Sequence, residues 1–219
     1  MQFGDVTIDF RKSLPVFPLP DSVLLPSGQM PLHIFEPRYR AMTSEALDSF
    51  GLIAMGTFDG PVSQEEYWNG FPPLRPSMCA ASIRDWKKLP DGRYLIVLLG
   101  LCRVRLLKEE PNEPYRRAFF EPTEPDPVDQ SKLSVERAEL LQLLSDPYLR
   151  GIEDVRDLRS DADAGAETTA LIDRSIMVFA PDAELRYKML EEISPQQRAT
   201  FLFKQIESVR ELIQRRSQN

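Results

Sequence analysis

The stretch PLPDSVLLPSGQMPLHIFEPRY, residues 18–39, decides how the rest of the chain is arranged. Four prolines fall within its first fourteen residues, and each fixes φ, so an α-helix is excluded there. After Gly28, apolar Met30, Leu32 and Ile34 alternate with Pro31, His33 and Phe35, which predicts a short strand. Pro37 then favours a helix start, and the apolar spacing that follows predicts a helix over 38–50. A strand therefore leads directly into a helix.

The residues after this helix are rich in strand signals. Gly51 is expected to end the helix in the left-handed conformation, and 52–58 to return as a buried strand. Pro90-Asp91-Gly92 lies between apolar runs and predicts a β-hairpin of 78–89 with 93–99. We expect further strands at 101–107, where Arg103 and Arg105 would face solvent or a partner, and at 115–120.

The second half of the chain has a helical period. The segment EPTEPDPVDQSK, residues 121–132, contains three prolines and four acids and is typical of a linker. Helices are predicted at 134–144, 168–179 and 183–192, and a last one follows the cap Ser194-Pro195. In that last helix an apolar stripe at 3 and 4 spacing predicts bundle core rather than a coiled-coil seam. We predict a β-rich domain at 1–121, a linker at 122–133 and a helical bundle at 134–219.

Residues 59–76, DGPVSQEEYWNGFPPLRP, show neither a helical nor a strand period and are predicted to form a long loop. Long loops within compact domains often carry function, although this one could instead cover the core as a lid. Its candidate binding residues are Tyr67, Trp68 and Phe71, to which we add Met55 and Phe58 from the preceding strand.

Composition excludes several classes of site. His33 is the single histidine and the two cysteines, Cys79 and Cys102, are far apart, so no metal site and no cofactor are expected. We interpret His33 as structural, and a bond between Glu36 and Arg38 is expected to tie the strand to the helix. A net charge of −7 argues against general affinity for nucleic acid or anionic membrane. Short apolar runs and the acidic first ten residues predict no membrane segment or signal peptide, and hence a cytoplasmic protein.

The sequence LPVFPLPDSVLLPSGQMPLHIFEPRYRAM, residues 14–42, resembles the opening of the Lon N-terminal, substrate-binding domain family. Residues 73–81, 89–100 and 103–106 are similar to later strands of that domain, in the same order. The resemblance implies an α+β fold in which a PUA-like β pseudo-barrel with one inserted helix precedes a C-terminal α-helical bundle. The signature residues, which we interpret as structural, are Pro31, His33, Phe35, Glu36, Pro37, Arg38 and Tyr39.

The resemblance also bears on function. It implies a stand-alone, non-enzymatic module that recognises unfolded or exposed polypeptide or acts as an adaptor, because no Gly-Lys dipeptide of an ATPase phosphate loop occurs. Expected partners are polypeptide substrates or a partner protein, with no membrane. The alternative is an RNA-binding PUA-like protein that uses the basic residues of the strands, which are Arg84, Lys87, Lys88, Arg93, Arg103, Arg105, Arg116 and Arg117. That alternative rests on fold analogy, and a solvated sheet face explains the same residues.

Overall fold

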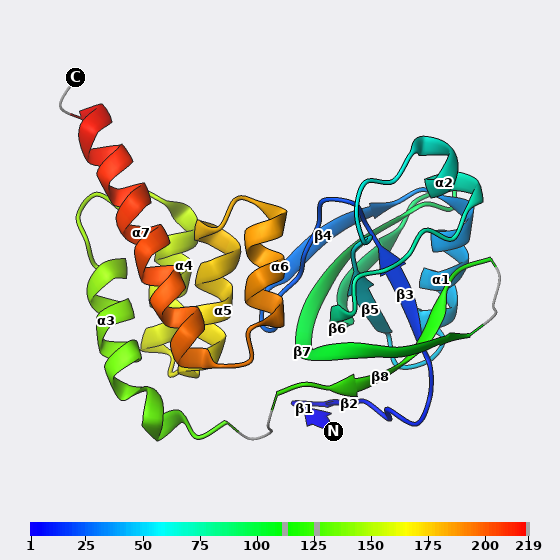
Figure 1. Ribbon diagram of the computed structural model, residues 1–219, viewed down its shortest axis with the longest axis horizontal. Coiled ribbons are helices and arrows are strands. Elements are labelled where there is room, and N and C mark those ends of the chain that lie inside the picture. Colours follow the sequence, from blue (N-terminus) through cyan, green and yellow to red (C-terminus); the bar gives the residue numbers. More distant parts are fainter. Residues whose placement is uncertain (111–113, 125–127, 218–219) are drawn as a thin grey trace. The chain divides into compact units, whose positions relative to one another are not determined.

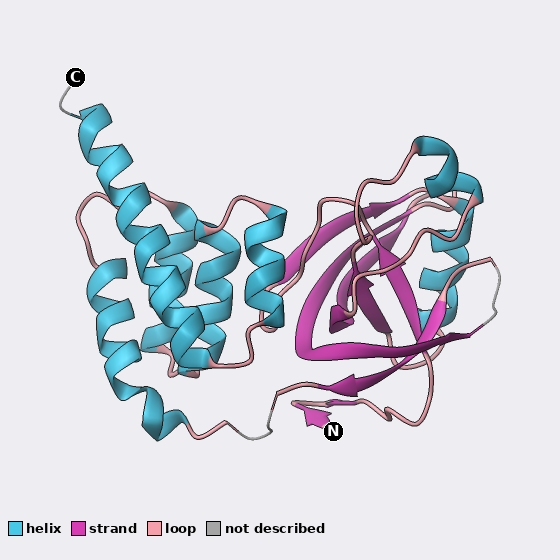
Figure 2. Ribbon diagram, viewed as in Figure 1, coloured by secondary structure: helices cyan, strands magenta, loops and turns pink. Residues whose placement is uncertain are grey.

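The computed structural model describes residues 1–110, 114–124 and 128–217. The chain forms two compact units, Met1–Glu124 and Pro125–Asn219, and each is considered by itself. The first is a mixed β-sheet with helices, and the second is helical, so the α+β fold is confirmed (Figures 1 and 2). Part of the predicted linker, 125–127, lies outside the described residues. Strand β8 ends at Pro122 and a 3-10 turn begins at Gln130.

The sheet of the first unit closes on itself. Its strand order is β4-β7-β6-β5-β3-β8, and an additional pairing of β7 with β8 joins the two ends of a five-stranded ring. The strands are β3 (Leu14–Pro18), β4 (Gln29–Ile34), β5 (Leu52–Gly56), β6 (Ser77–Lys88), β7 (Tyr94–Glu110) and β8 (Arg117–Pro122). Strand β4 lies outside the ring, antiparallel to the first part of β7, with Pro31 opposite Val97. A separate two-stranded sheet joins β1 (Gln2–Phe3) to β2 (Val6–Thr7).

Strand β7 is long enough to pair with the strands at both ends of the sheet. The sequence predicts two strands separated at Gly100, but the structure has one strand of 17 residues that passes through it. A Cβ on Gly100 would lie 2.2 Å from the carbonyl oxygen of Leu25, so only glycine admits this close approach. The backbone N–H of Ser27 donates to the Gly100 oxygen at 2.8 Å. The strand can therefore pair with β4 before Gly100 and with β8 after it.

Helix α1 (Pro37–Leu47) lies in the connection between the parallel strands β3 and β5. It begins at Pro37 as predicted and buries Tyr39, Met42 and Ala46. It ends at Leu47 rather than at residue 50, and Gly51 follows in the left-handed conformation with φ of +67°. Inside the ring, the core contains aliphatic and aromatic residues of every ring strand, including Val16, Ala54, Met78, Val104 and Phe120.

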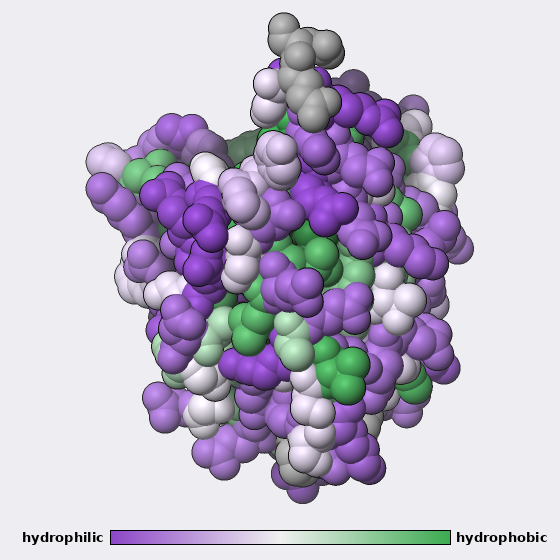
Figure 3. All heavy atoms as spheres, turned by 90° about the vertical axis from the view of Figure 1, so that its left-hand side faces the viewer, coloured by the Kyte–Doolittle hydropathy of each residue, from purple (hydrophilic) through white to green (hydrophobic). Residues whose placement is uncertain are grey.

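The second unit packs helices around an aliphatic core. The helices are α3 (Ser134–Leu144), α4 (Glu153–Asp163), α5 (Thr168–Phe179), α6 (Ala183–Glu191) and α7 (Pro195–Ser217). In α7, the predicted core stripe is buried at Ala199, Leu202 and Ile206, and half-buried further along. An ion pair is also enclosed: Arg198 Nε lies 3.0 Å from Asp173 Oδ1, with side-chain exposures of 1% and 3%. The face in Figure 3, on the side of α3 and α7, is mainly hydrophilic around a small apolar area.

Candidate functional site

The segment 59–76 contains a helix that the sequence reading missed. Helix α2 (Gln64–Asn69) begins with a capping box, in which Ser63 Oγ accepts from the Glu66 N–H and a Glu66 carboxylate oxygen accepts from the Ser63 N–H. The pattern Ser63-x-x-Glu66 was the signal for this start. The predicted structureless loop was therefore wrong at 64–69. The helix fixes Tyr67 and Trp68 on a regular backbone.

A buried carboxylate ties α2 to the start of α1. Glu36 is 5% exposed and accepts from Arg38 Nε at 2.9 Å and from the Tyr67 hydroxyl at 2.7 Å. Arg38 Nη2 donates to the Tyr67 carbonyl oxygen at 3.0 Å. The expected Glu36–Arg38 bond is thus present. It joins the strand-to-helix junction to a helix that lies 29 residues further along the chain.

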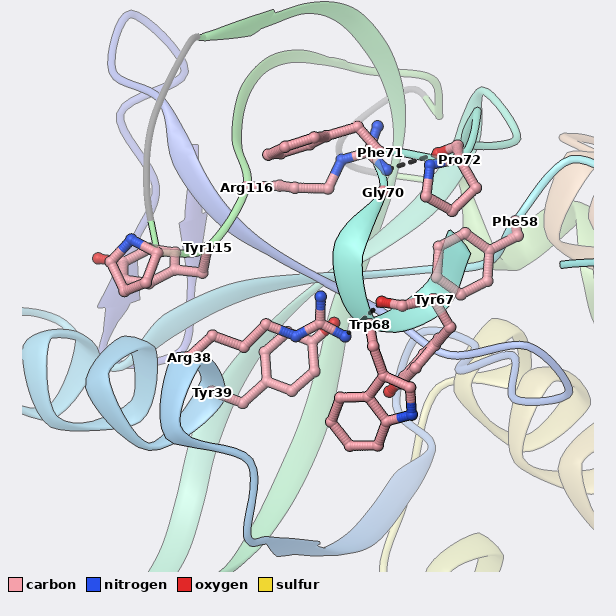
Figure 4. Close-up of a pocket in the computed structure, with 11 residues that line it drawn as sticks. Arg38, Tyr39, Phe58, Tyr67, Trp68, Gly70, Phe71, Pro72, Tyr115 and Arg116 are labelled. Carbon is pink, nitrogen blue, oxygen red and sulfur yellow. Dashed lines mark hydrogen bonds between the residues drawn. The ribbon is translucent and has the colours of Figure 1, made fainter. Parts of the chain in front are cut away.

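Arg38 and Tyr67 line a pocket of about 250 Å³ (Figure 4). Two arginines, six aromatic side chains and small or rigid residues form its wall, namely Arg38, Tyr39, Phe58, Tyr67, Trp68, Gly70, Phe71, Pro72, Pro114, Tyr115 and Arg116. Tyr39 and Phe58 are buried, whereas Trp68 is 47% and Phe71 64% exposed. The pocket therefore has a fixed aromatic floor and two large apolar side chains that face solvent.

The aromatic rings pack on one another and on the Arg38 guanidinium. The Tyr67 ring meets Phe58 edge-on at 5.9 Å and Trp68 edge-on at 5.3 Å, measured between ring centroids. Arg38 Cζ lies 4.6 Å from the Tyr39 centroid and 4.9 Å from that of Tyr67. Burial, together with the hydrogen bond to Glu36, raises the pKa of the Tyr67 hydroxyl to about 12. Tyr67 therefore keeps its proton and stays a donor to Glu36 at neutral pH.

Arg116 lies in the wall of the pocket opposite Arg38 and is fixed by several hydrogen bonds. Its Nε and Nη2 each donate to Glu109 at 2.6 Å, and its Nη1 donates to the Pro72 carbonyl oxygen at 2.6 Å. Its guanidinium carbon lies 5.9 Å from the Phe71 ring centroid. Next to it, the Tyr115 hydroxyl donates to Glu45 on α1. Charged contacts on both sides therefore fix the backbone that carries the exposed rings.

The structure brings Phe58, Tyr67, Trp68 and Phe71 together in this pocket. Met55, the other candidate, is 1% exposed and does not line it. Sequence reasoning did not assign Arg38, Tyr39, Tyr115 or Arg116 to a pocket. No sequence signal links these four residues. Tyr115 and Arg116 directly precede β8, and they come close to Arg38 and Tyr39 on α1 only because the sheet closes.

The signature residues separate into two groups. Glu36, Arg38 and Tyr39 belong to the pocket and its support. The others are exposed: Pro31 and His33 on β4, Phe35 directly after it, and Pro37 at the start of α1. The centroids of the His33 and Phe35 rings lie 5.9 Å apart. The His33 side chain is therefore at the surface and not in the barrel interior.

Several of the eight basic residues considered for an RNA-binding face are paired with acids. Arg103, expected at the surface, is 1% exposed and pairs with Glu124 at 3.1 Å, so that expectation was wrong. Arg116 pairs with Glu109 and Arg117 with Glu45. The long-range closure of the sheet, which the alternating sequence does not reveal, places acids beside these arginines.

No group of three or more His, Cys, Asp and Glu side chains within 1–110, 114–124 and 128–217 could hold a metal ion. Cys79 and Cys102 are both buried. No helix in the described part of the chain has the length and apolarity to cross a membrane.

Comparison with known proteins assigns the family. The model of the ATP-dependent protease La (LON) substrate-binding domain matches residues 13–208. The chain belongs to this family. Among curated relatives, Lon protease of Parabacteroides distasonis is 28% identical over 142 residues, which is 58% of this chain and 16% of that protein. Lon protease 2 of Bdellovibrio bacteriovorus is 26% identical over 212 residues, which is 88% of this chain and 26% of that protein.

Solved structures show the same fold in this LON substrate-binding domain. The N-terminal domain of the Mycobacterium avium complex Lon protease has a TM-score of 0.66 at 17% identity, covering 90% of this chain and 98% of that one. A Lon N-terminal domain protein from Xanthomonas campestris has a TM-score of 0.61 at 19% identity, covering 88% and 98%. The chain spans only 16% and 26% of the length of these two curated relatives.

Proposed function

We propose that this chain is a polypeptide-recognition module without catalytic activity of its own. In this proposal, exposed apolar segments of unfolded protein bind at the aromatic pocket, either for holding or for delivery to a partner protease. The observation that carries the proposal is the exposure of Trp68 and Phe71 on a fixed framework. Exposed aromatic residues on a rigid backbone supply contact area at a low ordering cost. The family assignment supports the same function.

The proposal includes a reducing, cytoplasmic compartment. Its support is that the chain has only two cysteines, Cys79 and Cys102, which are buried in neighbouring strands, β6 and β7. Their positions on the pleat differ, since Ala80 is opposite Cys102 and Cys79 is opposite Arg103. The two side chains therefore lie on opposite faces of the sheet, where they cannot form a bond with each other.

The test is fluorescence polarisation with a labelled, permanently unfolded polypeptide at low salt and at about 0.5 M salt. Binding by aromatic contacts should persist at the higher salt, whereas binding to phosphate groups falls steeply. A labelled single-stranded RNA serves as the second probe. Salt-labile binding of RNA alone would replace this proposal with the nucleic-acid alternative.

Variants locate the binding surface. Trp68→Ala and Phe71→Ala should each weaken polypeptide binding about tenfold, the usual effect of truncating an aromatic contact of this kind. The matched control is Trp86→Ala, because Trp86 is 52% exposed but lies on β6 outside the pocket. Equal loss of binding in the control would show that the pocket is not the binding surface. A large drop in melting temperature for the pocket variants would make Trp68 and Phe71 structural.

A further inference from the structure

Among the described residues, the wall of the aromatic pocket contains two guanidinium groups and no carboxylate. Arg38 and Arg116 line it, and none of the described lining residues is acidic. Their partner carboxylates, Glu36 and Glu109, lie behind the two guanidinium groups and do not line the pocket. A ligand in the pocket therefore meets guanidinium N–H groups and aromatic rings, on a chain whose net charge is −7.

The Arg38 guanidinium has donor capacity that the described residues do not use. Its Nε bonds Glu36 and its Nη2 bonds the Tyr67 carbonyl oxygen, which accounts for two of the five N–H groups of an arginine. Among the described residues, its Nη1 has no hydrogen-bond partner. The side chain is 22% exposed, so the remaining donors are open to water or to a ligand. A planar fork of N–H groups in aromatic surroundings is suited to a carboxylate, which can accept two of them.

The size of the pocket limits what accompanies the carboxylate. A volume of about 250 Å³ lies just below the range of about 300–1,000 Å³ that holds a drug-sized ligand, so it suits one residue. Trp68 and Phe71 offer apolar contact beside the guanidinium. In a C-terminal residue, the α-carboxylate and the side chain share one Cα. An internal Asp or Glu would instead bring the chain on both sides of it into the same space.

We infer that the pocket binds the C-terminal residue of a polypeptide, with its α-carboxylate on Arg38 and its apolar side chain against Trp68 and Phe71. This inference rests on the proposed function and names the part of the client that is recognised. Arg116 contributes positive charge from the opposite wall, and its contacts to Glu109 and Pro72 hold it in place. The same protein should bind a chain end in preference to an internal segment of equal sequence.

The test compares peptides rather than proteins. Three fluorescent peptides share one apolar sequence: one ends in a free carboxylate, one in an amide, and one is an amide with aspartate as its last residue. With the wild-type protein, the free acid should bind about tenfold more tightly than the plain amide. The aspartyl amide distinguishes a side-chain carboxylate from an α-carboxylate, and it should bind like the plain amide.

Protein variants then assign the preference to the pocket. Arg38→Gln should bind acid and amide equally, and Trp68→Ala should weaken both while the preference for the acid remains. Arg11→Gln is the charge-matched control, because Arg11 pairs with Asp9 and its side chain is 90% exposed outside the pocket. If Arg38→Gln does not fold, Arg116→Gln should still reduce the preference for the acid.

The outcomes separate this inference from the proposed function. Equal binding of acid and amide that Trp68→Ala weakens would overturn the carboxylate inference and leave polypeptide recognition standing. Binding of the aspartyl amide as tight as that of the free acid would overturn the chain-end assignment. Binding of none of the three peptides would overturn both proposals.

Discussion

Glu36 is the residue on which the pocket framework most depends, and Glu36→Ala should destabilise the first unit strongly. The substitution removes two hydrogen bonds to an ionised acceptor, from Arg38 and from the Tyr67 hydroxyl. Each bond of this kind contributes about 1.5–3 kcal/mol. Because the Arg38 side chain is 22% exposed, water recovers part of the loss. We expect a decrease of about 3 kcal/mol in the free energy of unfolding.

Urea unfolding followed by tryptophan fluorescence measures this decrease. Both tryptophans, Trp68 and Trp86, lie in the first unit, so the signal reports that unit alone. With a slope of about 2 kcal/mol per molar urea, the midpoint should fall by about 1.5 M. The control Glu65→Ala removes an exposed acid of α2 and should change stability by less than about 0.5 kcal/mol.

A double-mutant cycle tests the reason for the decrease. Glu36→Ala and Tyr67→Phe remove opposite ends of the same hydrogen bond, so their effects should be non-additive by about 1 kcal/mol. A loss below about 1 kcal/mol for Glu36→Ala, or additive effects in the cycle, would refute the view that this carboxylate holds α2 to α1.

Further predictions concern the helical unit, the barrel and the pH dependence. Asp173→Ala should lower the free energy of unfolding by about 3–5 kcal/mol, measured by urea unfolding followed by circular dichroism, because it leaves the buried Arg198 charge uncompensated. Replacing both Asp173 and Arg198 with apolar residues should restore much of this stability. A single variant as stable as the wild type would contradict a stabilising role for the ion pair. Gly100→Ala should cost about 1–3 kcal/mol, because its Cβ meets a backbone oxygen, whereas Gly151→Ala has open space and should cost much less. The raised pKa of Tyr67 stabilises the folded state below about pH 10, and this contribution is lost as the pH rises through about 12. Tyr67→Phe should therefore reduce the fall of stability between about pH 10 and pH 12. It should also remove one tyrosinate absorbance step near pH 12. If the step that disappears lies near pH 10, the Tyr67 hydroxyl has its ordinary pKa.

Sequence reasoning succeeded where the signal is local. Pro37 and Gly51 mark the beginning of α1 and the turn after it because each restricts or permits specific backbone angles. The hairpin at Pro90-Asp91-Gly92 and the helix after Ser194 follow from the same kind of chemistry. Helix α2 was missed although its capping box was present, because glycines and prolines surround a helix of only six residues.

The parts that could not be predicted depend on contacts between distant residues. The pairing of β7 with both β4 and β8 decides that Arg103 is buried and that Arg116 faces the pocket. An alternating strand pattern shows which residues share a face but not which face is covered. The aromatic residues of α2 could be identified as binding candidates from the sequence. Their proximity to Arg38 and Tyr115 could not, because it depends on the closure of the sheet.

Strand β4 has a consequence for how the protein resists aggregation. Among the described strands it pairs with β7 alone, so its other edge is unpaired. Such an edge is a template on which strands of misfolded chains can grow. Pro31 lies within the six residues of β4 and has no N–H to offer, so an added strand would lose a hydrogen bond in the middle of its register. One imino acid thus makes β4 a poor template for the addition of further strands.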